Sequence, residues 1–367
     1  MEPILEELDI EGYHKVVKVT EPSCGLVAII SIHDLTMGPS LGGIRFYPYE
    51  NFDAALFDAM RLSKGMTYKS AMVDFGCGGG KSVIIADPKT QKTPELLRAF
   101  GKAINRLGGI YIGAEDSGCT PEDLAIMNEE TPYLVGLMHE KSSGHPSPYT
   151  AWGTFRGIEA ALKFRFGSTE VAGKHFAFQG VGSVGEIVAE HLFWRGAKLT
   201  FADVNVENCE RLAKKFGAEV VSTDEIVTHK CDVFVPCALG GVIHKENIPQ
   251  LQCQIIAGCA NNVLLEESDG DLLKERNILY APDFVINGGG LINVVCEIAK
   301  EGYCPIATRN STDKIYESLL SIFQEAEKTG CSTVKAAITL AKYRLQHEIG
   351  KRPYEPCFHH SSNKVTS

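Results

Sequence analysis

The sequence predicts an α/β fold in two domains, and three observations lead to that prediction. The chain has 367 residues, more than a single hydrophobic core usually organises. From about residue 174 onward, apolar strand segments alternate with helical segments, which is typical of a parallel sheet with right-handed crossovers. A Gly-x-Gly-x-x-Gly motif at residues 180–185 follows one strand directly and opens a helix, the context in which this motif indicates dinucleotide binding.

Individual elements are predicted from local signals along the chain. Six apolar runs are expected to form buried strands, at residues 27–32, 82–85, 176–178, 199–201, 233–235 and 255–257. Three helix starts carry a hydroxyl residue followed by proline, at Thr93-Pro94, Thr120-Pro121 and Ser147-Pro148. The first of these helices is expected to end at Gly108. Residues 311–349 are expected to be helical, and the tail from Lys351 to be frayed.

Composition and charge exclude several classes of function. The formal net charge of −10 argues against an electrostatic nucleic-acid binder. No run approaches the roughly 18 apolar residues of a membrane-spanning helix, and the acidic N-terminus lacks the features of a signal peptide. The 12 cysteines show no Cys-x-x-Cys pair and no metal-site spacing. We therefore expect a cytoplasmic protein with free thiols, no metal, no membrane association and no nucleic-acid partner.

Two lysines lie 12 positions apart in glycine-rich sequence, Lys69 in Gly65-Met66-Thr67-Tyr68-Lys69 and Lys81 in Gly78-Gly79-Gly80-Lys81. We interpret this stretch as a loop that follows a helix over residues 52–62. Glycine lets backbone approach a ligand closely, and a desolvated lysine either binds a carboxylate or loses its proton near neutral pH. In the functional interpretation, one lysine binds a ligand and the other takes part in the reaction. The alternative is a surface loop with two solvated lysines.

The glycine motif consists of Gly180, Val181, Gly182, Ser183, Val184 and Gly185. In such a motif the first glycine makes the tight turn, the second admits a pyrophosphate, and the third lets helix and strand pack closely. The helix N-terminus supplies unpaired N–H groups to the phosphates. Asp203 lies 18 residues past Gly185, where a carboxylate binds the adenosine ribose and repels a 2′-phosphate, so NAD is favoured over NADP. A turn residue is the other interpretation of Asp203.

Longer motifs run through most of the chain. Besides the two lysine segments, they are Gly38-Pro39-Ser40-Leu41-Gly42-Gly43-Ile44-Arg45, Asp58-Ala59-Met60-Arg61-Leu62, Ala114-Glu115-Asp116, Pro146-Ser147-Pro148, Pro236-Cys237-Ala238-Leu239-Gly240, Ala260-Asn261-Asn262, Ala281-Pro282-Asp283 and Val285-Ile286-Asn287. On these motifs the chain resembles the Glu/Leu/Phe/Val amino-acid dehydrogenase family, and most closely its leucine-specific members.

The resemblance implies an enzyme of two domains with a cleft between them that closes during turnover. Residues 1–145 would form a substrate-binding and oligomerisation domain, and residues 146–329 a Rossmann-type NAD-binding domain. Helices within residues 330–367 would pack back on the first domain. A homo-oligomer is implied as well. The implied reaction is reversible oxidative deamination, in which an L-amino acid, NAD⁺ and water give a 2-oxo acid, ammonium and NADH.

The resemblance also implies roles for the charged residues of the N-terminal half. Lys69 matches the lysine that binds the substrate carboxylate. Lys81 matches the catalytic lysine, whose pKa is lowered by burial and by the neighbouring cation, so that its amine can activate water. Asp116 matches the acid/base that moves protons on and off the substrate nitrogen. Ion pairs on the surface and a turn residue are the corresponding structural interpretations.

Smaller residues complete the implied site. Gly42, Gly43 and Met66 would pack against the substrate, as Gly290 would from the second domain. Asn262 would orient the nicotinamide and the substrate, with Ala238 and Asn261 nearby.

The preferred substrate is inferred from four positions. Glutamate enzymes carry a lysine where this chain has Leu41, and the matching position in the second domain is Val294, so the substrate side chain should be apolar. Ala114 favours branched-chain amino acids, leucine first, whereas Leu291 is typical of aromatic-specific relatives. Phenylalanine or tryptophan is therefore the alternative substrate. A catalytically inactive NAD sensor, or a reductase that acts on hydroxyl or carbonyl groups, are the rival classes.

Overall fold

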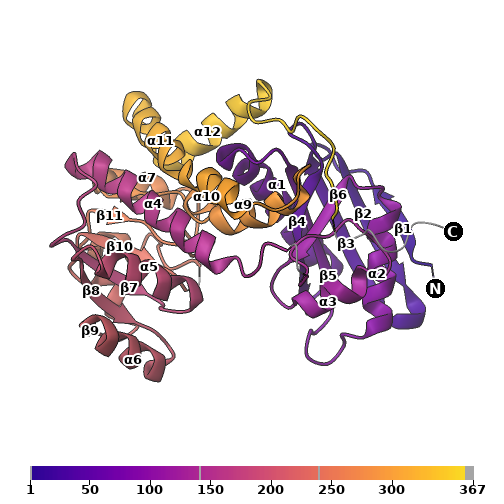
Figure 1. Ribbon diagram of the computed structural model, residues 1–367, viewed down its shortest axis with the longest axis horizontal. Helices are drawn as coiled ribbons and strands as arrows, with labels where there is room; N and C mark the ends of the chain where they lie inside the picture. Colours follow the sequence, from indigo (N-terminus) through magenta and orange to yellow (C-terminus); the bar gives the residue numbers. More distant parts are fainter. Residues whose placement is uncertain (1, 140–141, 239, 360–367) are drawn as a thin grey trace. The chain divides into compact units, whose positions relative to one another are not determined.

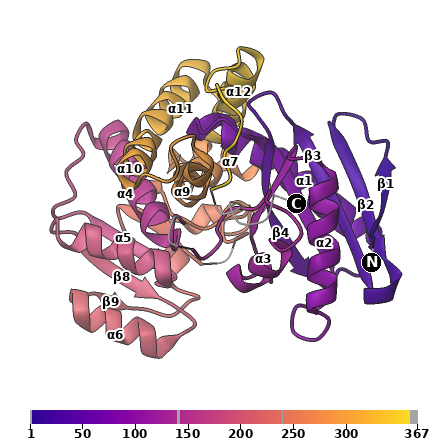
Figure 2. The same ribbon diagram turned by 45° about the vertical axis from the view of Figure 1, so that its right-hand side comes forward.

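The computed structural model describes residues 2–139, 142–238 and 240–359, which fold into two compact units (Figures 1 and 2). Unit 1 spans residues 1–144, 294–305 and 341–367, and unit 2 spans residues 145–293 and 306–340. Each unit contains its own six-stranded sheet, so the predicted α/β fold in two domains is confirmed. Within the described ranges, no helix has the length and apolarity required to cross a bilayer.

Unit 1 is built on a mixed sheet with the strand order β1-β2-β3-β5-β4-β6. Its strands are β1 (Ile4–Leu8), β2 (Lys15–Glu21), β3 (Leu26–Asp34), β4 (Ser40–Tyr47), β5 (Gly78–Ile85) and β6 (Tyr111–Glu115). β4 lies between β5 and β6 and runs parallel to both, whereas the remaining pairs are antiparallel. The carboxyl ends of β4, β5 and β6 therefore lie at one edge, where open α/β sheets usually bind ligands.

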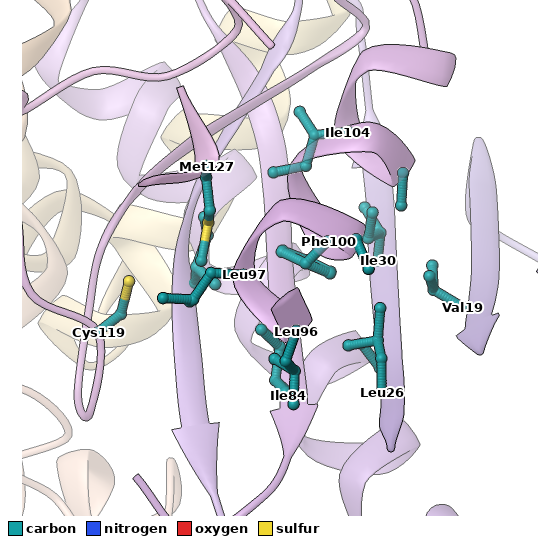
Figure 3. Packing of buried hydrophobic residues seen from close by; sticks show 14 of the residues in the cluster. Val19, Leu26, Ile30, Ile84, Leu96, Leu97, Phe100, Ile104, Cys119 and Met127 are labelled. Carbon is teal, nitrogen blue, oxygen red and sulfur yellow. The ribbon is translucent and has the colours of Figure 1, made fainter. Parts of the chain in front are cut away.

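One face of this sheet carries the largest apolar cluster of unit 1, beneath α2 (Pro94–Arg106) and next to α3 (Pro121–Met127). Leu96, Phe100 and Ile104 recur at helical spacing on α2 and point at the strands, where Ile30 and Ile84 meet them (Figure 3). Each such side chain contributes roughly 1.5–3 kcal/mol when it is fully buried. This cluster packs α2 and α3 against one face of the sheet.

The other face of the sheet is covered by α1 (Phe52–Val73). Successive strand residues point to opposite faces, so Ile29 and Val83 face α1 while their neighbours Ile30 and Ile84 face α2. Ala55 and Ala59 form the contacting side of the helix. Because alanine is small, α1 approaches the strands closely, and its backbone lies near β5.

The prediction of a lysine loop is wrong. Gly65 to Lys69 lies inside α1, which ends only at Asp74 in the left-handed conformation (φ 59°). Gly78 to Lys81 forms the start of β5. A Cβ on Gly79 would lie 2.0 Å from the Thr67 hydroxyl oxygen and 2.3 Å from its backbone nitrogen. The glycines of β5 therefore serve close helix–strand packing, and sequence composition alone does not distinguish that purpose from a flexible loop.

Two of the three expected helix caps are confirmed. Thr93 accepts a hydrogen bond from the Leu96 N–H, and Thr120 forms a capping box with Asp123. Gly108 follows α2 in the left-handed conformation, at φ 61°. Ser147 is not a cap: it is the first residue of α4 (Ser147–Phe166), and Pro146 occupies the N-cap position without a side-chain hydrogen bond.

Unit 2 is a doubly wound parallel sheet with the order β12-β11-β10-β7-β8-β9. Its strands are β7 (His175–Gln179), β8 (Lys198–Ala202), β9 (Glu219–Val220), β10 (Val233–Pro236), β11 (Ile255–Ile256) and β12 (Leu279–Tyr280). The order reverses beside β7, which pairs with β8 on one side and β10 on the other. A nucleotide site is expected at the carboxyl end of the strand where this reversal occurs.

Helices complete the fold. They are α5 (Ser183–Phe193), α6 (Val206–Phe216), α7 (Asp269–Glu275), α8 (Asp283–Ile286), α9 (Gly289–Val295), α10 (Pro305–Asp313), α11 (Ile315–Thr329) and α12 (Thr333–Gln346). Short 3₁₀ helices occur at Pro22–Cys24, Ile226–Thr228, Ile248–Gln250 and Cys296–Ile298. The expected helical segment from residue 311 is thus formed by the end of α10 together with α11 and α12.

The expectation of a frayed tail is wrong for residues 351–359, whereas residues 360–367 lie outside the described ranges. The Arg352 N–H donates to the Met37 carbonyl (2.9 Å), and its guanidinium donates to the carbonyls of Gly76 (3.0 Å) and Phe75 (3.2 Å). Arg352 thereby binds the turn between α1 and β5. These contacts join residues at least 276 positions apart in the chain, so no local signal predicts them.

Candidate active site

The two lysines lie on elements that pack against each other within unit 1. Thr67 on α1 touches Gly79 on β5, and each lysine follows its contact residue by two positions. Lys81 is almost completely buried, with 6% of its surface exposed. Lys69 is half-buried. The close packing of α1 on β5 therefore holds both lysines on ordered backbone rather than on a mobile loop.

Lys81 forms an ion pair with Asp116, which directly follows β6. The pair connects the first half of β5 to the carboxyl end of β6, and β4 lies between these two strands. Gly43 on β4 makes room for it, because a Cβ at Gly43 would lie 2.6 Å from the Asp116 Cβ and 3.1 Å from its Cγ. The carboxylate of Asp116 thus rests over the backbone of Gly43.

Arg45 joins a second carboxylate to this pair. Its Nε donates to Asp116 Oδ2 (3.0 Å), and its Nη1 donates to Asp58 Oδ2 (3.0 Å). The Tyr49 hydroxyl also donates to Asp58 Oδ2, at 2.6 Å. In the sequence Arg45 and Asp58 are only parts of matching motifs, and Tyr49 has no predicted role. An arginine two positions past the Gly42-Gly43 pair, in an otherwise apolar segment, is the signal that could have indicated a site residue.

Burial and charge shift the pKa values of the central pair. Burial is the largest influence on Lys81 and lowers its pKa; the Arg45 cation lowers it further, while Asp116 opposes the shift. For Asp116, burial alone would raise the pKa, but the cations of Lys81 and Arg45 outweigh it and hold the pKa below its ordinary value. The site therefore favours an ionised carboxylate beside a lysine that loses its proton more easily than usual.

The small residues predicted to contact a substrate flank this cluster on β4 and β6. Gly42 pairs with Gly113 and Gly43 with Ala114 in the parallel register of the two strands. A Cβ on Gly42 would lie 1.8 Å from the Gly80 carbonyl oxygen, so no larger residue fits there. Leu41 is fully buried beside them.

Four further predicted substrate residues lie elsewhere in the two units. Met66 is half-buried on α1. Val294 is buried in unit 1, with its Cγ1 about 3.9 Å from the position of a Cβ on Gly136. Leu291 is half-buried on α9 and belongs to unit 2. Gly290 packs on α4, because a Cβ there would lie 2.5 Å from the Thr150 hydroxyl oxygen.

The glycine motif of unit 2 forms the turn between β7 and α5, and its three glycines differ in backbone conformation and in the space around them. Gly180 adopts φ 92°, a backbone conformation that side chains rarely allow. Gly185 lies so close to the first turn that a Cβ would be 2.6 Å from the Gly180 carbonyl oxygen. Gly182 is exposed and has open space where a Cβ would stand. It is also the N-cap of α5 and makes no side-chain capping bond.

This turn has the properties of an anion site. The first N–H groups of a helix lack partners inside the helix and carry positive potential. Ser183 is exposed and Val184 half-buried, so the helix start is open to solvent. These residues fit a dinucleotide, whose pyrophosphate requires a close backbone approach at Gly182 and N–H donors at the start of α5.

Asp203 follows β8 and contacts the glycine motif directly. One carboxylate oxygen accepts the Val181 N–H (2.8 Å), and the other accepts the Asn205 N–H (2.8 Å). Asn208 donates from its side chain to the Val181 carbonyl (3.1 Å), so the same backbone segment is held from both sides. Asp203 therefore orients the turn after β7 as well as placing a negative charge beside it.

The polar residues after β10 and β11 form a second group in unit 2. Asn261 and Asn262 are exposed, and Asn262 adopts φ 51°. Asn287 donates to the Asn261 side-chain oxygen at 2.7 Å, and the Gly241 N–H donates to the Asn262 carbonyl at 2.6 Å. The exposed Ala238 lies against Gly180, where a Cβ would be 2.7 Å from the Ala238 methyl group.

In the described part of the chain, no cluster of three or more His, Cys, Asp or Glu side chains is arranged to hold a metal ion.

Comparison with known proteins agrees with this geometry. Residues 14–133 match the model of the Glu/Leu/Phe/Val dehydrogenase dimerisation domain, and residues 200–352 match the Glutamate/Leucine/Phenylalanine/Valine dehydrogenase model. Leucine dehydrogenase of Thermoactinomyces intermedius is 44% identical over 344 residues, which cover 94% of this chain and 93% of that protein. Phenylalanine dehydrogenase of Caldalkalibacillus thermarum is 44% identical over 345 residues, 92% of each chain.

A solved structure extends the comparison to three dimensions. The crystal structure of L-tryptophan dehydrogenase from Nostoc punctiforme has a TM-score of 0.83 and 42% sequence identity, covering 92% of this chain and 96% of that one. The three relatives act on different amino acids by their names, so their similarity identifies the class of reaction but not the side chain of the substrate. The chain therefore belongs to the Glu/Leu/Phe/Val dehydrogenase family and is an amino-acid dehydrogenase, an oxidoreductase of CH–NH₂ groups whose family uses NAD(P).

Proposed function

We propose that this protein catalyses the NAD-dependent, reversible oxidative deamination of branched-chain L-amino acids, leucine first, with valine and isoleucine as further substrates. The amino acid, NAD⁺ and water give the 2-oxo acid, ammonium, NADH and a proton. The buried ion pair of Lys81 and Asp116, with its shifted pKa values, is the observation on which the proposal mainly rests. It provides a base and a proton carrier at one place, which deamination requires.

Lys69 binds the substrate α-carboxylate and keeps its charge in this role. Its position on α1 is fixed by the packing of Thr67 on β5, so the cation is presented from ordered backbone. Fixing the carboxylate places the Cα–N bond relative to Asp116. Positioning of this kind increases the rate, because the reacting groups are already held in the required orientation.

Asp116 carries protons to and from the substrate nitrogen. Its lowered pKa keeps it ionised at neutral pH, ready to accept a proton from the substrate ammonium group. The neutral amine that results can release the hydrogen of Cα as a hydride, leaving an imine. Asp116 then returns the proton to nitrogen when ammonia leaves.

Lys81 acts on water. Its lowered pKa makes the neutral amine accessible, and this amine takes a proton from the water that attacks the imine carbon. Oxygen thereby joins Cα and the electron pair of the C=N bond moves to nitrogen, which gives a carbinolamine. The hydroxyl proton of this carbinolamine is then released as the C=O bond forms and the carbon–nitrogen bond breaks, so that ammonia leaves and the 2-oxo acid remains. The removal of Lys81 should abolish turnover because the chain then lacks the base for this step.

NAD accepts the hydride when it is bound. In our proposal its pyrophosphate would be held by Gly180, Val181, Gly182 and the start of α5, at Ser183, Val184 and Gly185, and its ribose would be bound by Asp203. Ala238, Asn261 and Asn262 orient the nicotinamide. The charge of Asp203 disfavours a 2′-phosphate, which supports NAD over NADP.

The substrate preference rests on apolar residues. Leu41 and Val294 are buried and carry no charge that could pair with a second carboxylate, which disfavours glutamate. Ala114 leaves more room than a larger residue and suits a branched side chain, together with Gly42, Gly43 and Met66. Leu291 favours the alternative, phenylalanine or tryptophan, because aromatic-specific relatives resemble the chain at this position.

Assembly and location follow from the family as proposals. The match to a dimerisation-domain model supports a homo-oligomer. We assign unit 1 to the substrate and subunit contacts and unit 2 to NAD. The free thiols and the acidic composition support a cytoplasmic location.

The test is a spectrophotometric panel of leucine, valine, isoleucine, phenylalanine, tryptophan and glutamate with NAD⁺ and with NADP⁺. Leucine with NAD⁺ should give the highest kcat/KM, and Lys81→Ala should give no NADH. Comparable kcat/KM values for phenylalanine and leucine would refute the branched-chain assignment, and a preference for NADP⁺ would refute the role of Asp203. A protein that binds NAD but oxidises none of the six amino acids is a sensor rather than an enzyme.

A further inference from the structure

Arg45 occupies an unusual position, because it bonds to two carboxylates at once. Its Nε reaches Asp116 and its Nη1 reaches Asp58, each at 3.0 Å. The side chains of Arg45 and Asp58 are about three-quarters or more buried, with 24% and 17% of their surface exposed. A planar guanidinium offers donors in fixed directions, so two contacts on different edges fix its orientation completely.

The far end of this bridge is itself fixed. The Tyr49 hydroxyl donates to the same Asp58 oxygen that Arg45 contacts, at 2.6 Å, and Arg61 donates to the other oxygen at 2.9 Å. Asp58 lies on α1, while Arg45 lies on β4. The position of the guanidinium is therefore determined by a helix and a strand of the same unit, independently of Lys81.

The charges around Asp116 explain the importance of the two ion pairs of Arg45. Lys81 of β5 and Arg45 of β4 are the cations that contact its carboxylate, and Asp58 is the nearest further anion of the network. Tyr111 and Cys119 also lie close enough to interact, but burial raises the pKa of both, so they stay neutral. When Lys81 gives up its proton, Asp116 keeps one cationic partner, and that partner is Arg45.

We propose that Arg45 is a positioning residue that acts through Asp116 and Lys81: it holds the Asp116 carboxylate over Gly43 and remains its counter-ion while Lys81 is neutral. A buried carboxylate without a cation is strongly disfavoured. Without Arg45, Asp116 would therefore hold Lys81 in its charged form and would itself take up a proton more readily. The reaction would need a higher pH to begin. This inference rests on the proposed function for its kinetic test, but its second test needs no turnover.

Two variants of Arg45 test the proposal. Arg45→Gln removes both the charge and the guanidinium donors. Arg45→Lys keeps the charge but cannot donate to Asp116 and Asp58 in two fixed directions. The matched control is Arg61→Gln, because Arg61 also pairs with Asp58 but does not contact Asp116 in the bonds described. The kinetic measurement is kcat/KM for the best amino acid as a function of pH. The second measurement is the titration of the Asp116 carboxyl carbon by NMR, in protein labelled with ¹³C at aspartate Cγ and assigned with Asp116→Asn.

In Arg45→Gln the rise of kcat/KM with pH should move upward by about one pH unit, and the Asp116 carboxyl should titrate at higher pH. Below that rise the rate should fall by about 10²-fold. Arg45→Lys should lower kcat about tenfold or more while the pH of the rise stays near that of the wild type. Arg61→Gln should change neither measurement.

Several results would overturn the proposal. A uniform loss of rate in Arg45→Gln, with the rise and the carboxyl titration both unmoved, would mean that Arg45 is only structural. An equal shift in Arg61→Gln would assign the effect to long-range charge, and full activity in Arg45→Lys would remove the positioning role. If Arg45→Gln fails to fold, Arg45→Lys carries the test. If the wild type oxidises no amino acid, the proposed function fails, while the carboxyl titration still decides the role of Arg45.

Discussion

Substitution of Gly43 by alanine should separate catalysis from folding in this protein. The added methyl group would stand 2.6 Å from the Asp116 Cβ, whereas ordinary van der Waals contact begins at 3.4 Å. Asp116 must therefore withdraw by the difference between these distances, 0.8 Å. The Glu115 carbonyl oxygen, 3.1 Å from the same methyl position, limits how far the strand itself can shift. The carboxylate would leave its bonding distance to Lys81 and Arg45.

The expected magnitudes follow from that displacement. A misplacement of about 1 Å at a reacting group costs about 10²-fold in rate, so kcat/KM for leucine should fall by about that factor. An extra methyl group in a packed site typically costs about 1–3 kcal/mol of unfolding free energy. The loss of rate should therefore be far larger than the loss of folded protein can explain.

Two measurements check this prediction: NADH formation with leucine, and the midpoint of urea denaturation. Gly65→Ala is the matched control, because Gly65 lies in α1 and has open space where the Cβ would stand. That variant should be stabilised by roughly 0.5–1 kcal/mol with activity retained. A Gly43→Ala enzyme with the kcat/KM of the wild type would refute the claim that Asp116 acts from its position over Gly43.

Three other substitutions test separate parts of the molecule. Asp203→Asn keeps an acceptor for the Val181 N–H but removes the charge, and the ratio of kcat/KM for NADP⁺ to that for NAD⁺ should rise about tenfold. Arg352→Ala removes the guanidinium bonds to the carbonyls of Gly76, Phe75 and Ile298 and should lower the unfolding free energy by about 1–3 kcal/mol in urea titration. Burial lowers the pKa of His33, so the unfolded chain binds more protons between the folded pKa and the ordinary value of 6.5, and stability should increase with pH across that window. His33→Gln should show a shallower increase in urea titrations at several pH values, and an unchanged slope would contradict the assignment.

Unit 2 was predictable around its glycine motif because the signals there are local. The strand 176–178, the glycine motif and the helix after it occupy one short stretch, and the contact that restricts Gly185, with the Gly180 carbonyl, lies within it. Hydroxyl–proline pairs likewise predicted the starts of α2 and α3 from two residues each. Where a structural cause lies within one turn of the chain, the residues on either side are enough to infer it.

Unit 1 was harder to predict because the contacts that explain its structure join residues distant in sequence. Residues 40–47 form a central strand, yet two glycines and an arginine hide the apolar pattern that predicts one. Arg45 meets Asp116 across 71 positions. The glycines of β5 predicted a loop, since their true reason, contact with α1, appears only after the sheet is assembled.

These distant causes have a common physical origin. Two cations and two carboxylates can be buried together only if their backbones come close enough for direct pairing, because a water-filled gap or a mismatched distance would leave charges uncompensated. Side chains on β4 and β5 would prevent that approach: a Cβ on Gly42 would meet the Gly80 carbonyl oxygen at 1.8 Å, and one on Gly79 would meet Thr67. Glycine at these positions is therefore a condition for the ion pairs, and the flexibility that the glycine runs suggest in the sequence becomes rigidity in the folded unit.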